Sequence, residues 1–206
     1  MPSRSLFLAI ALVGGCGGNS GNNTADMAPG GCTSMGKDVP AYTGDDSGAL
    51  AATGPVVVTY APDAKLASIY GSQVLTQTGQ TTSMFGSWAV TFYSPSLAHN
   101  FIGSFSGASG HVGCQDVKVP VPPPAEPNPQ LNSADVVGTA VSRIMVDSPN
   151  AKIPGVCDAV NFGKVAAGGN PPHDQAWMVS IQPWIVIVDD NSNTAVECTR
   201  SGSPCN

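Results

Sequence analysis

An alternation of apolar and polar residues occurs twice along the chain, each time directly after a tryptophan. Residues 88–95 (WAVTFYSP) and 177–183 (WMVSIQP) both show this two-residue period. A second apolar stretch, a turn rich in small polar residues and a short segment that ends in cysteine follow each of them. Period-two alternation bounded by Gly, Asn, Asp and Ser is typical of antiparallel strands, so each stretch predicts a three-stranded meander.

A helical spacing of apolar residues precedes each predicted meander. The first set consists of Leu66, Ile69, Tyr70 and Val74. The second set follows Ser133, a residue type that favours the helix N-cap, and consists of Val137, Ala140, Val141, Ile144 and Met145. Because the residues of each set lie three or four positions apart, each set predicts the apolar face of one helix. A further strand is expected at residues 55–60.

The order of these elements predicts an α+β fold with two repeats of one helix followed by a three-stranded antiparallel meander. Over about residues 55–200, this order resembles the PepSY-like domains of bacterial secreted and lipid-anchored proteins. Such domains occur in protease propeptides, where inhibition is proposed, and in envelope proteins of unknown role. The resemblance implies a fold without catalytic residues and a role in restraining a secreted peptidase.

Changes in composition divide the chain into successive regions. They are a lipoprotein signal peptide at 1–15, a flexible tether and N-terminal segment at 16–54, a first helix-plus-meander unit at 55–118, a Pro-rich spacer at 119–130, and a second unit at 131–206 with an irregular insert at 148–174. The Gly, Ser and Asn residues after position 16 bury too little apolar surface to offset chain entropy, which favours a tether. The spacer should be extended, because proline favours the polyproline II conformation.

The first sixteen residues predict a lipid anchor. Arg4 precedes an apolar run, Leu6 to Val13, and then two glycines, which is the order of a secretory signal. This run is shorter than the roughly 20 residues that span a bilayer. Val13-Gly14-Gly15-Cys16 resembles a bacterial lipobox, in which cleavage precedes the cysteine and its thiol is acylated. The resemblance implies lipidation of Cys16 and sorting to the outer membrane; the alternative is an ordinary signal peptide with an incidental cysteine.

The charge of the chain excludes some classes of partner. The formal net charge is -6, only 11% of residues are charged, and no cluster of Lys and Arg is present. Binding to nucleic acid is therefore not expected, because phosphate contacts need cationic side chains. The sequence also lacks the Cys and His spacing of a zinc site, so no metal or cofactor is expected.

Five cysteines remain if Cys16 is lipidated. They are Cys32, Cys114, Cys157, Cys198 and Cys205. In an oxidising compartment these residues are expected to form disulfides, and their odd number leaves one thiol unpaired within the chain. The connectivity does not follow from the sequence. Trp184, which has no aromatic counterpart in the first repeat, is predicted to be an exposed residue that contacts a partner.

The sequence carries no recognisable catalytic motif. The leading hypothesis is therefore a noncatalytic, lipid-anchored protein of the bacterial cell envelope that binds an envelope protein through a sheet face or edge. One alternative is a cell-surface hydrolase whose site is assembled from distant loops, because catalytic groups converge in space rather than in order. The other alternative is a passive coat or assembly component.

Overall fold

The computed structural model describes residues 36–39, 44–77, 80–82, 86–107, 109–116, 129–167 and 172–206. The helices within these ranges are α1 (Asp46–Tyr60) and α2 (Ser133–Asp147). The strands of the first half are β1 (Gly36–Val39), β2 (Lys65–Gln77), β3 (Gln80–Thr82), β4 (Ser87–Ser94), β5 (His99–Ser106) and β6 (Ser109–Asp116). Those of the second half are β7 (Val156–Val165), β8 (His173–Ile181), β9 (Trp184–Asp189), β10 (Thr194–Arg200) and β11 (Ser203–Pro204).

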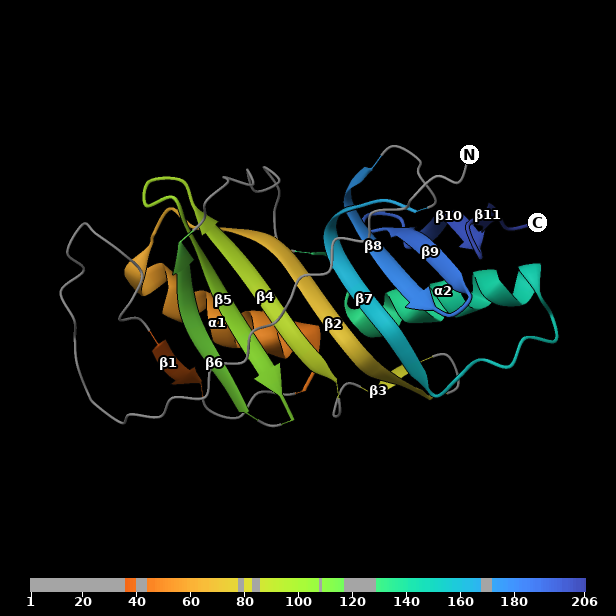
Figure 1. The fold of residues 1–206 in the computed structure, drawn as a ribbon, viewed down its shortest axis with the longest axis horizontal. Helices are drawn as coiled ribbons and strands as arrows, with labels where there is room; N and C mark the ends of the chain where they lie inside the picture. The colour runs from red at the N-terminus through yellow and green to blue at the C-terminus, as the bar shows by residue number, and fades with distance from the viewer. Residues whose placement is uncertain are drawn as a thin grey trace, which may run out of the picture.

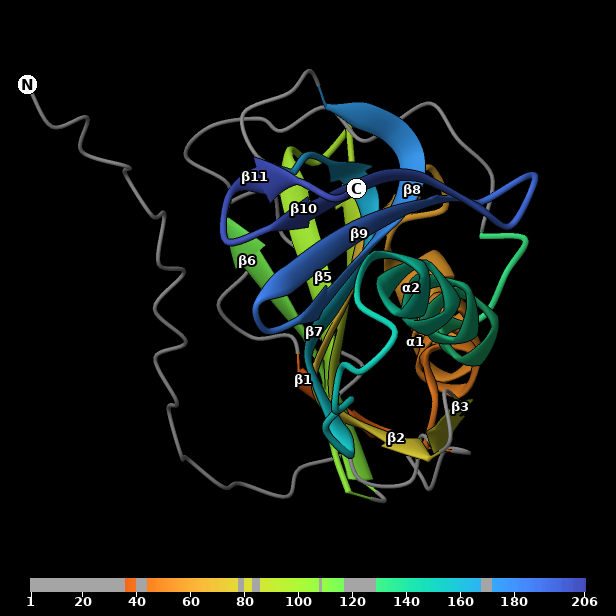
Figure 2. The same cartoon turned by 90° about the vertical axis from the view of Figure 1, so that its right-hand side faces the viewer.

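All these strands belong to one antiparallel sheet (Figure 1). Their order across the sheet is β1-β6-β5-β4-β2-β7-β8-β9-β10-β11, and the short β3 pairs with the end of β2. Both helices lie on the same side of the sheet (Figure 2). We call this side the helix face and the opposite side, on which no described helix lies, the uncovered face. Over the second half of the sheet a small cluster on that face, Val165, Ala167, Ala176 and Ile187, is nevertheless buried.

The predicted fold of two repeats, each with one helix and a three-stranded meander, is wrong. The chain forms a continuous sheet, and the two halves of that sheet are joined by antiparallel pairing of β2 with β7. Each helix is followed along the chain by four long strands rather than three. The strand that the prediction lacked is β2 in the first half and β7 in the second, and these two strands lie at the centre of the sheet.

The helix predicted from Leu66 to Val74 is part of β2. Its neighbours on both sides explain the error, because Ile69 pairs with Val90 of β4 and with Phe162 of β7. The buried residues Leu66, Ile69 and Val74 are three and five positions apart, which does not show the two-residue period of a strand. A shift of register beside Leu66 disturbs the two-residue period further.

Residues 55–60, predicted as a strand, form the second half of α1. The β-branched residues that follow Pro55 favour a strand locally, but packing against the sheet overrides this preference. Val57 and Ala49 are completely buried on the face of α1 that covers the sheet. Residues 46–54, part of the tether and N-terminal segment predicted at 16–54, form the first half of the same helix.

The second predicted helix agrees with α2. Its buried apolar residues include Val137, Ala140 and Ile144, which follow the predicted spacing. The N-cap is Asn132 instead of Ser133, and its side-chain oxygen accepts a hydrogen bond from the backbone N–H of Asp135 at 3.0 Å. The predicted irregular insert at 148–174 is also corrected, because β7 runs through its middle.

The two tryptophans that open the alternating stretches lie in the core between helices and sheet. Trp88 and Trp177 are 2% and 0% exposed. The indole N–H of Trp88 donates to the carbonyl of Gly44 at 3.2 Å, and that of Trp177 donates to Oδ1 of Asp190 at 2.8 Å. Trp88 therefore fixes the segment before α1 to the sheet, and Trp177 fixes the turn that contains Asp190.

Candidate functional site

Trp184, predicted to be an exposed contact residue, is 6% exposed. Its indole N–H donates to Oδ2 of Asp147 at the end of α2, at 3.1 Å. The guanidinium of Arg200 lies 5.4 Å from the centre of its ring. The prediction is corrected because this indole packs between α2 and β10 rather than facing a partner.

The cysteines follow the disulfide prediction only in part. Cys198 and Cys205 form a disulfide that joins β10 to the C-terminal segment, and Cys114 is also disulfide-bonded. Cys157, predicted as a disulfide partner, is a free and fully buried thiol in β7. Burial raises the pKa of this thiol to about 12. Its inaccessible position in the core explains why it is unpaired.

The predicted lipidation site, Cys16, and the predicted disulfide partner Cys32 lie outside the described residues. Within the described part of the chain, neither helix has the length and apolarity needed to cross a membrane.

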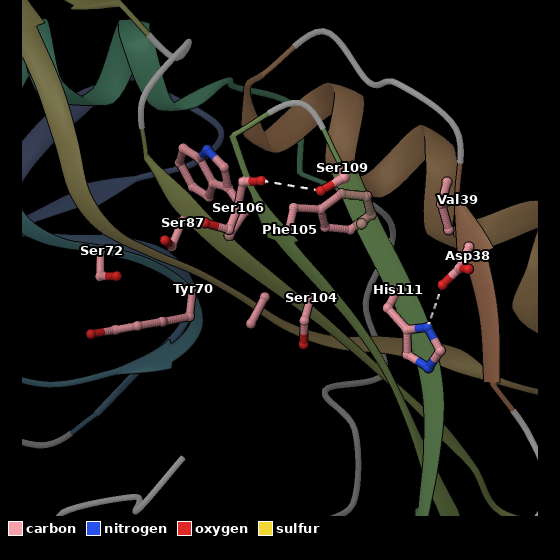
Figure 3. Close-up of a pocket in the computed structure, with 13 residues that line it drawn as sticks. Asp38, Val39, Tyr70, Ser72, Ser87, Ser104, Phe105, Ser106, Ser109 and His111 are labelled. Atoms are coloured by element: carbon pink, nitrogen blue, oxygen red, sulfur yellow. Dashed lines mark hydrogen bonds and ion pairs between the residues drawn. The ribbon is translucent and has the colours of Figure 1, made fainter. Parts of the chain in front are cut away.

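The uncovered face carries a cavity of about 590 Å³ over the first half of the sheet (Figure 3). Residues from β1, β2, β4, β5 and β6 line it. The residue type they share most often is serine: Ser72, Ser87, Ser104, Ser106 and Ser109. Tyr70 of β2 and His111 of β6 also line the cavity.

The strand register places these hydroxyl groups in order. Ser109 pairs with Ser106, Ser106 with Ser87, and Ser87 with Ser72, so four serines form a row across β6, β5, β4 and β2. Directly paired residues project from the same side of a sheet, and neighbouring strands lie about 4.8 Å apart. The row therefore presents one hydroxyl per strand at a regular spacing.

A second row lies beside the first. Tyr70 pairs with Ala89, Ala89 with Ser104, and Ser104 with His111, which in turn pairs with Asp38 of β1. Tyr70 is 38% exposed, and the small side chain of Ala89 separates it from Ser104. An aromatic ring and several hydroxyls thus share one open surface.

The hydroxyls of Ser72, Ser87 and Ser104 make no hydrogen bond within the described part of the chain. Ser109 donates only a long bond, 3.5 Å, to the backbone carbonyl of Ser106. A serine hydroxyl is both a donor and an acceptor. The cavity therefore offers hydrogen-bonding groups that the described protein does not use itself.

His111 and Asp38 close one side of the cavity. Nδ1 of His111 lies 2.9 Å from Oδ1 of Asp38 (Figure 3), and both side chains are exposed. The His111 ring lies over Gly36 of β1, where an added Cβ would come within 2.8 Å of the ring. Gly36 therefore provides the space that the ring occupies.

Ser104, His111 and Asp38 are the residue types of a serine hydrolase triad, and the sheet places them in one row. Nucleophilic catalysis needs the serine and the histidine within hydrogen-bond reach. No hydrogen bond joins Ser104 to His111 here, and the ring leans toward β1, away from the strand that carries Ser104. In this structure the three side chains therefore do not form a hydrogen-bonded triad.

The electrostatic character of the cavity is close to neutral. Its described lining contains no lysine or arginine, and its acidic residue, Asp38, is already bonded to His111. Across the described ranges, no group of three or more His, Cys, Asp or Glu residues is placed to hold a metal ion.

A second cavity of about 630 Å³ lies beside α1 and residues 129–132. Asp46, the first residue of α1, borders it but is 1% exposed, and its Oδ1 accepts hydrogen bonds from the backbone and side chain of Ser133. Burial raises the pKa of this carboxyl above its ordinary value of 3.8. Since Asp46 joins the starts of the two helices, its role is structural.

Sequence reasoning did not find the hydroxyl rows. Tyr70 and Ser72 lie in the segment predicted to be a helix, so they could not be placed on a sheet face. The alternation of residues 88–95 does indicate which side of β4 is uncovered. The register that aligns Ser87 with Ser106 and Ser72 depends on how β4 pairs with β5 and β2, which the alternation within one strand does not specify.

The chain matches no protein-family model, and neither a curated protein nor a solved structure matches it.

Proposed function

We propose that this protein is a noncatalytic, lipid-anchored binding protein of the bacterial envelope, and that its partner binds on the uncovered face of the sheet. The observation that carries the proposal is the cavity of about 590 Å³, in which the serine hydroxyls of Ser72, Ser87 and Ser104, without partners in the described chain, share one surface with an exposed tyrosine. Concave sites with a few convergent polar groups are the usual places where proteins bind ligands.

The face is favoured over the edges of the sheet. The outermost strands in the described chain are β1, with four residues, and β11, with two. Short edge strands offer few backbone groups to an added strand and discourage such pairing. A partner that bound by strand addition would find little to pair with at either edge.

The anchor proposal rests on the resemblance of residues 13–16 to a lipobox. An acyl group on Cys16 would hold the protein at a membrane, and residues 17–23, rich in Gly, Asn and Ser, would let the sheet reach its partner. Changing Cys16 to alanine should move the protein from the membrane fraction to the soluble fraction. Unchanged membrane association of that variant would refute the anchor without bearing on the cavity.

In-cell photo-crosslinking tests the binding site. A benzophenone amino acid would replace Ser104 in the cavity or, as the control, Val146, which is 72% exposed on the helix side. After irradiation, each adduct would be examined for attached peptide and for attached sugar. We expect an adduct with another molecule at position 104 and none at 146. Adducts at neither position, or equally at both, would overturn the proposed site, and capture of only the protein itself would favour the coat alternative.

A further inference from the structure

We propose that the ligand of the cavity on the uncovered face is a neutral glycan chain, an inference that rests on the binding function proposed above. It concerns the same site and names the chemical class of the partner.

The charge of the lining is the first argument. A phosphate or a carboxylate would need Lys or Arg, and the described lining has neither. An amine would find one carboxylate in the described lining, that of Asp38, and would have to share it with His111, which is already bonded to its Oδ1. The lining is therefore complementary to an uncharged ligand.

The hydrogen-bonding groups are the second argument. Sugar hydroxyls donate and accept, and so do the hydroxyls of Ser72, Ser87 and Ser104, which have no partner in the described chain. Either group can rotate to match the other, so the surface can satisfy a dense array of ligand hydroxyls. A ligand that only donates or only accepts would use this lining less completely.

The spacing of the row is the third argument. The four serines from Ser109 to Ser72 lie on successive strands, about 4.8 Å apart. This distance is close to the length of one pyranose ring in an extended glycan. A glycan chain that crosses the strands would therefore meet one serine per sugar.

Tyr70 supplies the apolar contact that sugar binding also needs. Its ring is partly exposed at the end of the second row (Figure 3), and Ala89 and Ser104 beside it are small. The C–H face of a sugar can pack on an aromatic ring, whose face is electron-rich. The small neighbours leave room above the sheet for that contact.

The same lining is unlike the centre of a protein interface. Such centres are enriched in aromatic residues, Met and Arg and are depleted in Ser and Ala. Here five serines and Ala89 line the cavity, Tyr70 and His111 are its large exposed side chains, and the apolar lining residues Val39, Trp88 and Phe105 are buried. These residues favour a glycan over a protein segment as the occupant.

The test uses the full, lipidated chain in detergent on an array of neutral oligosaccharides, including cello-, chito-, manno- and galacto-oligomers, with polygalacturonate as the acidic comparison. We expect binding to at least one neutral glycan and none to the acidic polymer. Ser104→Leu, which fills the cavity, and Tyr70→Ala, which removes the ring, should each weaken that binding by at least about tenfold, equivalent to 1.4 kcal/mol.

Ser180→Leu is the matched control. Ser180 lies on the same face, in register with Ala159 of β7, but outside the cavity. It should leave glycan binding unchanged, and circular dichroism would show that all three variants are folded. Equal loss in the control, preference for the acidic polymer, or binding to no neutral glycan would overturn the inference.

The two proposals fail separately. A peptide adduct at position 104 in cells, together with an array on which no neutral glycan binds, would overturn the glycan and leave the binding function standing. A sugar adduct would support both. Absence of any adduct and of any glycan binding would overturn both.

Discussion

Asp46 and Ser133, the first residues of α1 and α2, are hydrogen-bonded to each other although 87 positions separate them. The backbone N–H of Ser133 donates to Oδ1 of Asp46 at 3.1 Å, and the Ser133 hydroxyl donates to the same oxygen. The second carboxylate oxygen is buried without a partner. These two hydrogen bonds join the N-termini of both described helices above the sheet.

The Asp46 carboxyl should make stability depend on pH in an unusual direction. Burial raises its pKa above 3.8, so the native state binds the proton more tightly than the unfolded chain does. The free energy of unfolding should therefore fall as pH rises from about 4 through the raised pKa, by about 1.4 kcal/mol for each unit by which that pKa is raised.

Urea unfolding at about pH 4 and about pH 8 measures this slope. Asp46→Asn keeps an acceptor for Ser133 but removes the proton equilibrium, so its profile should be flatter. The pKa values of Asp63, Asp147 and Asp189 are lowered, chiefly by hydrogen bonds from Ser94, Asn206 and Ser192. The stability from these groups is lost only below about pH 4, outside the tested range. An unchanged slope in Asp46→Asn would contradict the assignment.

Asp190→Ala should be strongly destabilising, although Asp190 lies in the turn between β9 and β10. Asp190 is 3% exposed and accepts hydrogen bonds from the N–H groups of Gln130, Leu131 and the Trp177 indole. Alanine would leave these donors without their acceptor, at about 1–3 kcal/mol for each one that stays buried. The unfolding midpoint should fall steeply. The neighbouring, exposed Asn191→Ala is the control, and equal effects of the two changes would refute this account.

Two glycine substitutions should act in opposite directions. A Cβ on Gly71 of β2 would lie 2.5 Å from the Trp88 ring, so Gly71→Ala should lower stability by about 1–3 kcal/mol through overpacking. A Cβ on Gly54, inside α1, would meet Phe92 at an ordinary 3.9 Å. Gly54→Ala should therefore raise stability by up to about 1 kcal/mol, the difference in helix propensity. Thermal melts of both variants measure the contrast, and a stable Gly71→Ala would show that Trp88 can move.

Cys157 should resist modification in the native protein. Its thiol is fully buried, so a reagent cannot reach it. Its pKa is raised to about 12, so the reactive thiolate is scarce at neutral pH. Iodoacetamide should label it only after unfolding in denaturant. Mass spectrometry of peptides would detect labelling under native conditions, and rapid native labelling would mean that the β2–β7 region opens readily.

The sequence predicted those elements whose patterns are local. The strands after Trp88 and Trp177, and the helix from Ser133, each carry a period of their own and lie where they were expected. The first helix and β2 were exchanged because the apolar spacing from Leu66 to Val74 and the valines after Pro55 match the wrong element locally. Burial of Val57 against the sheet and of Ile69 between two strands decides both cases, and tertiary packing is absent from a local pattern.

The candidate site could not be predicted from local sequence patterns for the same reason. Its serines are ordinary residues, and only their alignment makes them a surface. That alignment requires the register of β2, β4, β5 and β6, which joins residues up to about 37 positions apart. The prediction that Trp184 is exposed was wrong because the sequence does not show that Asp147 and Arg200 are its neighbours.

The antiparallel pairing of β2 with β7 means that each half of the chain covers a long strand edge of the other half. β2 has 13 residues and β7 has 10, far longer than the strands at the outer margins of the described sheet. A fragment that held only one half would present such a strand to solvent, with its backbone groups unpaired along much of its length. Fragments of this kind would associate through the exposed edge of β2 or β7. In the intact chain the other half already occupies that edge, as a second subunit would in a dimer.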